Sequence, residues 1–376
     1  MLRKTWSRIS VLLISAFLTT GCADPKTLER MGLITTVGYD VTEDGELQTT
    51  FVMLQIDPNA PQNSVVLTTK ALTSKGARIE ADLKSPKKLQ SGQLRVALFS
   101  EEVVKLGLIN LADTLSRDPS ISDLTYLAVV EGNTKKLLDQ KNSKFADISQ
   151  MIYKQLDQNT KGETVPSSTL QETMHDYYAP GVDPSMPLIK DRGGEIVITG
   201  MALISDDKMV GKINPEEAFF LKLINDRYKA GSIELTVSPD GLHYTKAVEG
   251  PDELAVVLDT INSKTDIKLI DKDTPKFELK ITLKTRLLEV NQALDLKSPD
   301  SLKQLEKKLS GKIKSDIEGL ITKAQELNSD PFGFGEIYRK NVRHSNLTTK
   351  SWHEIYPDSK VDVKIKFEIL RTGVVE

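Results

Sequence analysis

The last third of the chain carries the clearest alternation of apolar and polar positions. Phe277, Leu279, Ile281 and Leu283 alternate with charged or polar residues, and the same alternation returns over residues 361–369. A period of two is typical of strands that bury one face. We therefore predict two half-buried strands here, both of which need a layer that covers their apolar side.

Between these strands the spacing changes to steps of three and four. Apolar residues recur from Leu302 to Leu327, after a start signal at Ser298-Pro299. This spacing places one apolar stripe along a helix of about seven turns. The stripe would also suit a coiled coil. We favour a long helix, 299–328, that lies over an antiparallel C-terminal sheet.

Residues 23–178 mix strand and helix patterns without a regular βαβ period, which favours the α+β class. We expect antiparallel sheets with helices packed on one face. The expected strands are 33–41, 47–56, 64–71, 93–99 and 124–130, and the expected helices are 77–83, 101–107, 108–115, 134–138, 145–156 and 168–178.

Residues 179–194 hold three prolines and three glycines and predict a domain boundary. Beyond it we expect a hairpin over 195–213, a helix from Asn214, a strand at 232–237 and short strands at 254–261 and 265–270, although 254–261 also suits a helix. We thus expect three domains after a leader at 1–21: an N-terminal domain at 22–190, a middle domain at 195–265 and a C-terminal domain at 266–376.

The first 22 residues have the layout of a lipoprotein signal. Arg3, Lys4 and Arg8 precede the apolar stretch 9–18, and Gly21-Cys22 follows, with Thr19 where such signals usually carry Leu. We expect cleavage between Gly21 and Cys22 and an S-diacylglycerol modification of Cys22, with N-acylation and palmitate-type chains. The alternative is an ordinary signal peptide with a chance cysteine.

The composition and the absence of known motifs exclude several classes of function. Of 376 residues, one is cysteine and four are histidine, and the formal net charge of −3 becomes −6 without the leader. This acidic balance, without basic clusters, argues against nucleic acid as a partner. The sequence has no P-loop, G-x-S-x-G or C-x-x-C motif, and Pro357 stands where a zinc motif begun by His353-Glu354 needs histidine. We therefore expect no catalytic residues, no metal and no cofactor.

Several segments resemble one known family. They are MGLITTVGYDVTEDGELQTTFVMLQIDP, LRVALFSEEVVKLGLINLADTLSRDPSI, ITGMALISDDKMVGKINPEEA, SDPFGFGEIYRK, SWHEIYP and VDVKIKFEILRTG. Together with Gly21-Cys22 they resemble the Ger(x)C family, the lipoprotein C subunits of spore germinant receptors. The resemblance implies a three-domain α+β protein, anchored by lipid on the outer face of the inner spore membrane. It also implies integral A and B subunits as partners and a non-catalytic role in nutrient-triggered germination.

The motif SDPFGFGEIYRK and the segment SWHEIYP supply aromatic side chains. Phe332, Phe334, Trp352 and Tyr356 are candidate partner contacts, with core packing as the alternative. Two other functions remain open for the whole chain: a lipid-anchored solute-binding protein and an enzyme of the spore cortex.

Overall fold

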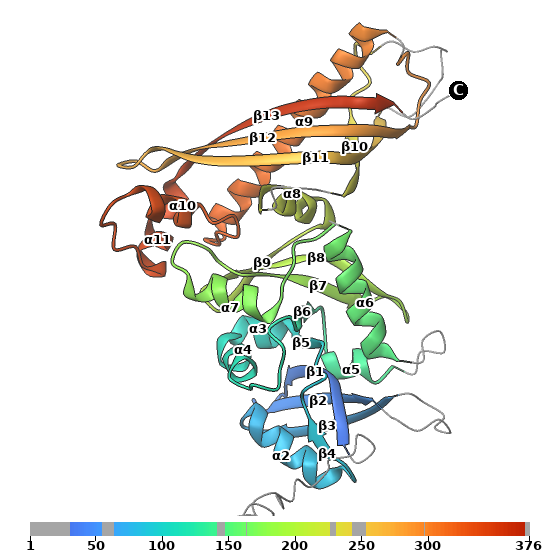
Figure 1. Cartoon of the computed structure of the whole chain (residues 1–376), viewed down its shortest axis with the longest axis vertical. Coiled ribbons are helices and arrows are strands. Elements are labelled where there is room, and N and C mark those ends of the chain that lie inside the picture. Colours follow the sequence, from blue (N-terminus) through green and yellow to red (C-terminus); the bar gives the residue numbers. More distant parts are fainter. Residues whose placement is uncertain are drawn as a thin grey trace, which may run out of the picture.

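The computed structural model describes residues 31–54, 64–140, 147–162, 164–225, 231–242, 253–296 and 298–372. Two sheets lie at opposite ends of an elongated molecule, sheet A in the lower part of Figure 1 and sheet B at the top. The fold is a mixed assembly of helices and sheets, as the α+β class predicts.

Sheet A has nine strands in the order β3-β2-β1-β5-β6-β7-β8-β9, with β4 beside β1. Its strands are β1 Met31–Val41, β2 Leu47–Leu54, β3 Ser64–Ala71, β4 Lys88–Gln90, β5 Val96–Ser100, β6 Tyr126–Val130, β7 Ser185–Asp191, β8 Ile196–Ser205 and β9 Lys208–Ile213.

Helices cover both faces of sheet A, whereas the sequence predicted one covered face. Strand β5 shows why: Ala97 and Phe99 face one core, and Val96 and Leu98 face the other. The first core takes helices α2 Ser74–Lys84, α3 Glu101–Leu106, α4 Ile109–Ser116 and α7 Leu170–Tyr178, and the second takes α5 Thr134–Leu138 and α6 Ile148–Lys161.

The strand pairing in sheet A is mixed. The pairs β1–β2, β2–β3 and β8–β9 are antiparallel as predicted, and β7–β8, whose first strand was not predicted, is antiparallel too, but β1–β5, β5–β6 and β6–β7 are parallel. Parallel neighbours need a crossover connection, and the short helices between β5 and β7 supply it. Strand β5 is apolar from Val96 to Phe99, without alternation of apolar and polar residues. Such a strand is typical of the centre of a sheet that is covered on both faces.

Sheet B has four strands, β10 Ser232–Val237, β11 Leu254–Asp271, β12 Lys276–Val290 and β13 Lys360–Thr372. The predicted strands 254–261 and 265–270 are one strand, β11. As predicted, the long helix α9, Pro299–Glu326, covers one face and buries its stripe from Leu305 to Ala324. Strand β13 pairs parallel to β12, not antiparallel, because α9 returns the chain to the end where β12 began.

The predicted boundary 179–194 contains strand β7, which pairs with β8 across residues 191–196. Pro187 concealed this strand, because proline is rare inside a sheet. Helix α8, Pro215–Asn225, packs its apolar side chains against both β8 and sheet B, so one core continues from sheet A to sheet B. The division into three domains stays a prediction.

Candidate functional site

The motif SDPFGFGEIYRK around Asp330 lies at the junction of two halves of the molecule, one built on sheet A and the other on sheet B. Helix α9 ends at Glu326, Asn328 adopts a left-handed conformation, and Gly333, with a φ of 74°, caps helix α10, Phe334–Asn341. This turn places Asp330 inside the protein with no exposed surface.

The Asp330 carboxylate accepts three hydrogen bonds. Its Oδ2 accepts from the Gly335 backbone N–H and from Trp352 Nε1, each at 3.0 Å, and its Oδ1 accepts from the Phe332 N–H at 3.2 Å. Burial raises the pKa of the Asp330 carboxyl to about 7, although the Gly335 and Trp352 donors lower it. Because the group is surrounded by fixed donors, it orders the turn that begins α10.

Asp183, in the loop before β7, joins the same site from the other half. The Asp183 N–H donates to the Asp330 carbonyl at 2.9 Å, and Asp183 Oδ2 accepts from the Asp330 N–H at 2.8 Å. Two segments 147 residues apart are thereby held by a reciprocal pair of bonds.

His353, on helix α11 (Thr349–Ile355), completes the site. Its Nε2 lies 2.9 Å from Asp183 Oδ2 and 3.1 Å from Oδ1, and its side chain is 10% exposed. Burial lowers the pKa of His353, but the hydrogen bond and charge of Asp183 outweigh burial and raise it overall. We call Asp183, Asp330, Trp352 and His353 the junction cluster.

Two glycines allow the halves to approach this closely. A Cβ on Gly335 would lie 2.4 Å from Gly181 Cα and 2.6 Å from Trp352 Cε2. Gly181 has a φ of +97°, and its carbonyl accepts a hydrogen bond from the Glu336 N–H at 3.0 Å. Only residues without a Cβ fit this backbone contact.

The four predicted contact aromatics lie inside this junction. Phe334, Trp352 and Tyr356 have no exposed surface and Phe332 is 7% exposed. Phe334 packs on Phe277 with ring centroids 5.1 Å apart, and Trp352 packs on Tyr356 at 5.7 Å. This burial disfavours direct contact with a partner and favours the alternative of core packing.

Two pockets flank helix α7 beside the junction. One, of about 350 Å³, is lined by residues that include Asp176, Asn225, Phe332 and Glu336; the other, of about 540 Å³, is lined by residues that include His175 and Arg339. Burial raises the pKa of Asp176 to about 6, although its hydrogen bond to His175 lowers it. This places a carboxyl that titrates near neutrality in a polar groove.

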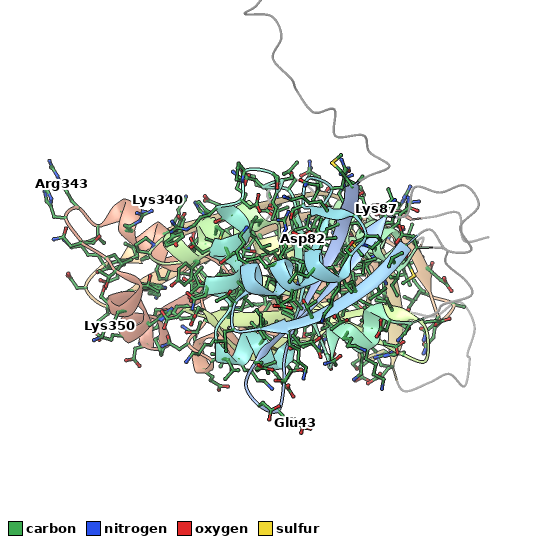
Figure 2. All side chains as sticks on the ribbon, turned by 90° about the horizontal axis from the view of Figure 1, so that it is seen from below. Glu43, Asp82, Lys87, Lys340, Arg343 and Lys350 are labelled. Atoms are coloured by element: carbon green, nitrogen blue, oxygen red, sulfur yellow. The ribbon has the colours of Figure 1, made fainter. Side chains whose placement is uncertain are left out.

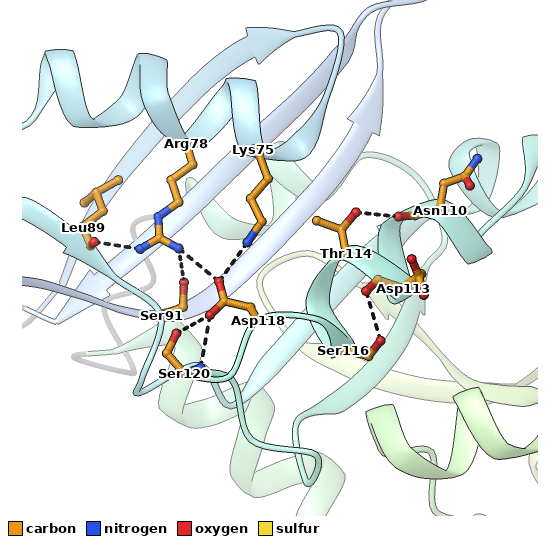
Figure 3. A network of polar contacts seen from close by, with 10 residues as sticks. All are labelled: Lys75, Arg78, Leu89, Ser91, Asn110, Asp113, Thr114, Ser116, Asp118 and Ser120. Atoms are coloured by element: carbon orange, nitrogen blue, oxygen red, sulfur yellow. Dashed lines mark hydrogen bonds and ion pairs between the residues drawn. The ribbon is translucent and has the colours of Figure 1, made fainter.

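A second polar network lies far from the junction, where α2 meets the loop after α4 (Figure 3). Lys75 and Arg78 reach Asp118 at 2.8 and 3.5 Å, and Arg78 also donates to Ser91 and to the Leu89 carbonyl. Burial works against ionisation of Asp118, but its bonds with Lys75 and Ser120 lower its pKa to about 2. The charges satisfy one another, so this network fastens α2 to sheet A.

Basic side chains mark another part of the surface. Figure 2 shows the α10–α11 segment at one side of the molecule, with Lys340, Arg343 and Lys350 at its margin. Lys340 pairs with Glu336 at 2.5 Å, so part of this charge is neutralised.

The remaining predicted residues are not brought together. Gly21, Cys22 and His243 lie outside the described residues, while His175 and His344 are exposed at the surface and are not members of the junction cluster. In the described ranges no group of three or more histidine, cysteine or acidic side chains is arranged to hold a metal ion. Nor does any described helix have the length and apolarity to cross a bilayer.

Sequence patterns missed the junction cluster because its members are distant in the chain. The one local signal was that Asp183 and Asp330 both stand directly before proline. In the sequence His353 is only the start of an incomplete zinc motif, whereas the structure pairs it with Asp183.

The junction cluster also predicts how stability depends on pH. The pKa of Asp330 is raised in the folded state from 3.8 to about 7, and the pKa of His353 is raised above 6.5, so the folded state binds more protons than the unfolded state. Stability should therefore fall as pH rises, through Asp330 between pH 3.8 and about 7 and through His353 above 6.5. We expect His353→Gln to remove the part of this fall above about pH 7, where Asp330 no longer contributes. Urea unfolding at several pH values measures it, and an unchanged slope there would contradict the pairing.

Comparisons with known proteins agree over almost the whole chain. Residues 24–191 match the family model described as the spore germination protein N-terminal domain, and residues 199–373 match the model of the spore germination B3/GerAC-like C-terminal region. Spore germination protein GerQC of Bacillus cereus is 27% identical, covering 99% of this chain and 100% of the relative. Spore germination protein B3 of Bacillus subtilis is 22% identical, covering 99% of both chains. The crystal structure of the GerBC protein matches with a TM-score of 0.55 and 19% identity, covering 92% of this chain and all of the other, which shows a shared fold.

Proposed function

The chain belongs to the Ger(x)C family of spore germination proteins, and from this membership we propose that it is a non-catalytic lipoprotein subunit of a nutrient-germinant receptor. The supporting observation is that family matches run from residue 24 to residue 373 with one short gap. They begin two residues after Cys22, so the matched body follows directly on the predicted lipoprotein signal.

Lipid on Cys22 would hold this body at the membrane. One acyl chain binds a bilayer only marginally, and two or more anchor it stably, because each buried CH₂ contributes about 0.8 kcal/mol. A diacylglyceryl cysteine therefore suffices without a membrane-spanning helix. We propose the outer face of the inner spore membrane as its location, and integral A and B subunits as its partners.

The junction cluster supports a role that depends on shape. Its titratable groups bond to backbone N–H groups, an indole and each other, inside the protein. Such groups can fix the two halves in one arrangement but do not meet a solute. We propose that the fixed arrangement of the halves is what the subunit presents to its partners.

A solute-binding protein is the second candidate, favoured by the groove of about 350 Å³ that contains Asp176 and Lys340. Because Glu336 of the same groove already pairs with Lys340, the carboxyl of Asp176 is left to bind a solute that carries an ammonium group. Calorimetric binding of a nutrient by the mature chain, lost in Asp176→Ala, would favour this alternative.

Replacement of the lipidated cysteine tests the main proposal. We expect Cys22→Ala to move the protein from the membrane fraction to the soluble fraction of spores and to impair germination in response to nutrient. Detergent phase partition and the loss of optical density after nutrient addition measure the two effects. Cys22→Ala spores that germinate at the normal rate with wholly soluble protein would contradict it.

A further inference from the structure

Sheet B leaves one face uncovered. Helix α9 and helices α8, α10 and α11 pack on the inner face, and the alternating side chains of β11, β12 and β13 point away from them on the other. We call this surface, from Asp259 to Asp271, from Lys276 to Leu288 and from Lys360 to Leu370, the open face.

The open face is basic although the chain is acidic. Its described side chains comprise nine cations, Lys264, Lys268, Lys276, Lys280, Lys284, Arg286, Lys360, Lys364 and Lys366, and six anions, Asp259, Asp266, Asp271, Glu278, Asp362 and Glu368. This is a formal excess of three positive charges, whereas the whole chain has a net charge of −3. The remainder of the chain therefore carries an excess of six negative charges.

The register concentrates this charge at the centre. Across the three strands, Asp266, Lys280 and Lys364 form one row, and Lys264, Thr282 and Lys366 form the next. Lysines 280 and 364 are direct cross-strand neighbours, and like charges in that position destabilise a sheet.

Few acids neutralise the central lysines. Lys364 is paired with Glu278, but Lys264, Lys280, Lys284 and Lys366 have no ion pair among the described residues. Exposed apolar side chains lie at the margins of the same surface: Ile270 is 57% exposed, Leu288 40% and Leu370 43%. Cations at the centre of a surface and exposed apolar side chains at its margins are the composition of a docking surface.

The position of the open face indicates what docks there. Sheet B lies at the end of the long axis opposite β1 and α2 (Figure 1). If Cys22 is lipidated, residues 23–30 reach at most about 28 Å from it, so the β1 end stays beside the bilayer. Sheet B then stands away from the lipid headgroups.

We propose that the open face of sheet B docks an acidic surface of another protein. This inference rests on the proposed function, because it takes the partner to be a protein at the same membrane. Complementary charge would speed association of the two proteins and set their relative orientation, while Ile270, Leu288 and Leu370 would add apolar contact.

The matched variants differ only in where charge is removed. One replaces Lys264, Lys280, Lys284 and Lys366 with Gln. The control replaces Lys70, Lys84, Lys303 and Lys307, which are exposed on other surfaces. Both lose four charges. Thermal unfolding checks that each variant folds: the control should unfold at the parent's midpoint, and the open-face variant at that midpoint or above it, because Lys280→Gln removes the like-charge neighbour of Lys364.

Full-length protein in spore membranes, with a photo-crosslinking amino acid in place of the exposed Asn262 beside Lys284, provides the probe. We expect a protein adduct whose crosslinked peptide is rich in Asp and Glu. Its yield should fall about tenfold in the open-face variant, since four screened surface contacts of a few tenths of a kcal/mol each sum to that factor, and not in the control. Adducts to phospholipid, no adduct, or equal loss in both variants would overturn the proposal. Membrane retention, measured in the same samples, reports on the lipid anchor separately, so a failed anchor and a failed docking surface are distinguished.

Discussion

Replacement of Gly335 with alanine is expected to lower the free energy of unfolding by more than about 3 kcal/mol. The new Cβ would lie 2.4 Å from Gly181 Cα and 2.6 Å from the Trp352 ring. One obstacle is backbone and the other is a fully buried indole, so neither moves freely. The halves would have to separate at the junction, which also breaks the bond from Glu336 N–H to the Gly181 carbonyl.

Gly319→Ala on helix α9 is the matched control, because it adds the same methyl group with nothing within 4 Å. Alanine is the better helix former, so this variant should gain up to about 1 kcal/mol. Urea unfolding followed by Trp352 fluorescence measures both, since the other tryptophan, Trp6, lies in the predicted leader. Equal midpoints for the two variants would show that the junction is not closely packed in solution.

Asp330→Ala is expected to cost about 3–5 kcal/mol, close to the loss seen when one partner of a buried polar network is removed. It leaves the N–H groups of Gly335 and Phe332 and the Trp352 indole without their acceptor inside the protein. Trp352 should then emit at longer wavelength, because water enters to satisfy its Nε1. Asp330→Asn keeps one oxygen and the volume, so its loss should be smaller.

The control for Asp330→Ala is Asp118→Ala. Asp118 also joins three donor residues, Lys75, Arg78 and Ser120, but water can replace it at the surface. We expect a loss of about 1 kcal/mol there. If Asp330→Ala is no more destabilised than Asp118→Ala, the junction cluster does not hold the halves together.

Sequence patterns predicted elements whose periodicity reflects one neighbouring layer. The strand 64–71, the helix 134–138 and the strand 232–237 have the predicted bounds, and the stripe of α9 lies on sheet B as expected. The pattern failed where two layers cover an element. Strand β5 is buried on both faces, and β7 carries Pro187, so neither alternates in a way that reveals its neighbours.

The site was less predictable than the fold. Aromatic residues near Phe334 could be found from the motif, but their burial depends on Phe277 and on the approach of Gly181. The bond between Asp183 and Asp330 spans 147 residues, and no local pattern encodes a pairing at that separation. Which charged residues lie inside the protein is decided by packing between halves, which a single sequence does not display.

The crossover through α9 has a consequence for synthesis. Strand β13 occupies the edge of sheet B beside β12, yet α9, α10 and α11 are made before it. Until β13 has been translated, β12 has a free edge and the apolar stripe of α9 is incompletely covered. A nascent or truncated chain that lacks β13 would therefore expose surface that chaperones and proteases recognise, so quality control should act on the C-terminal half last.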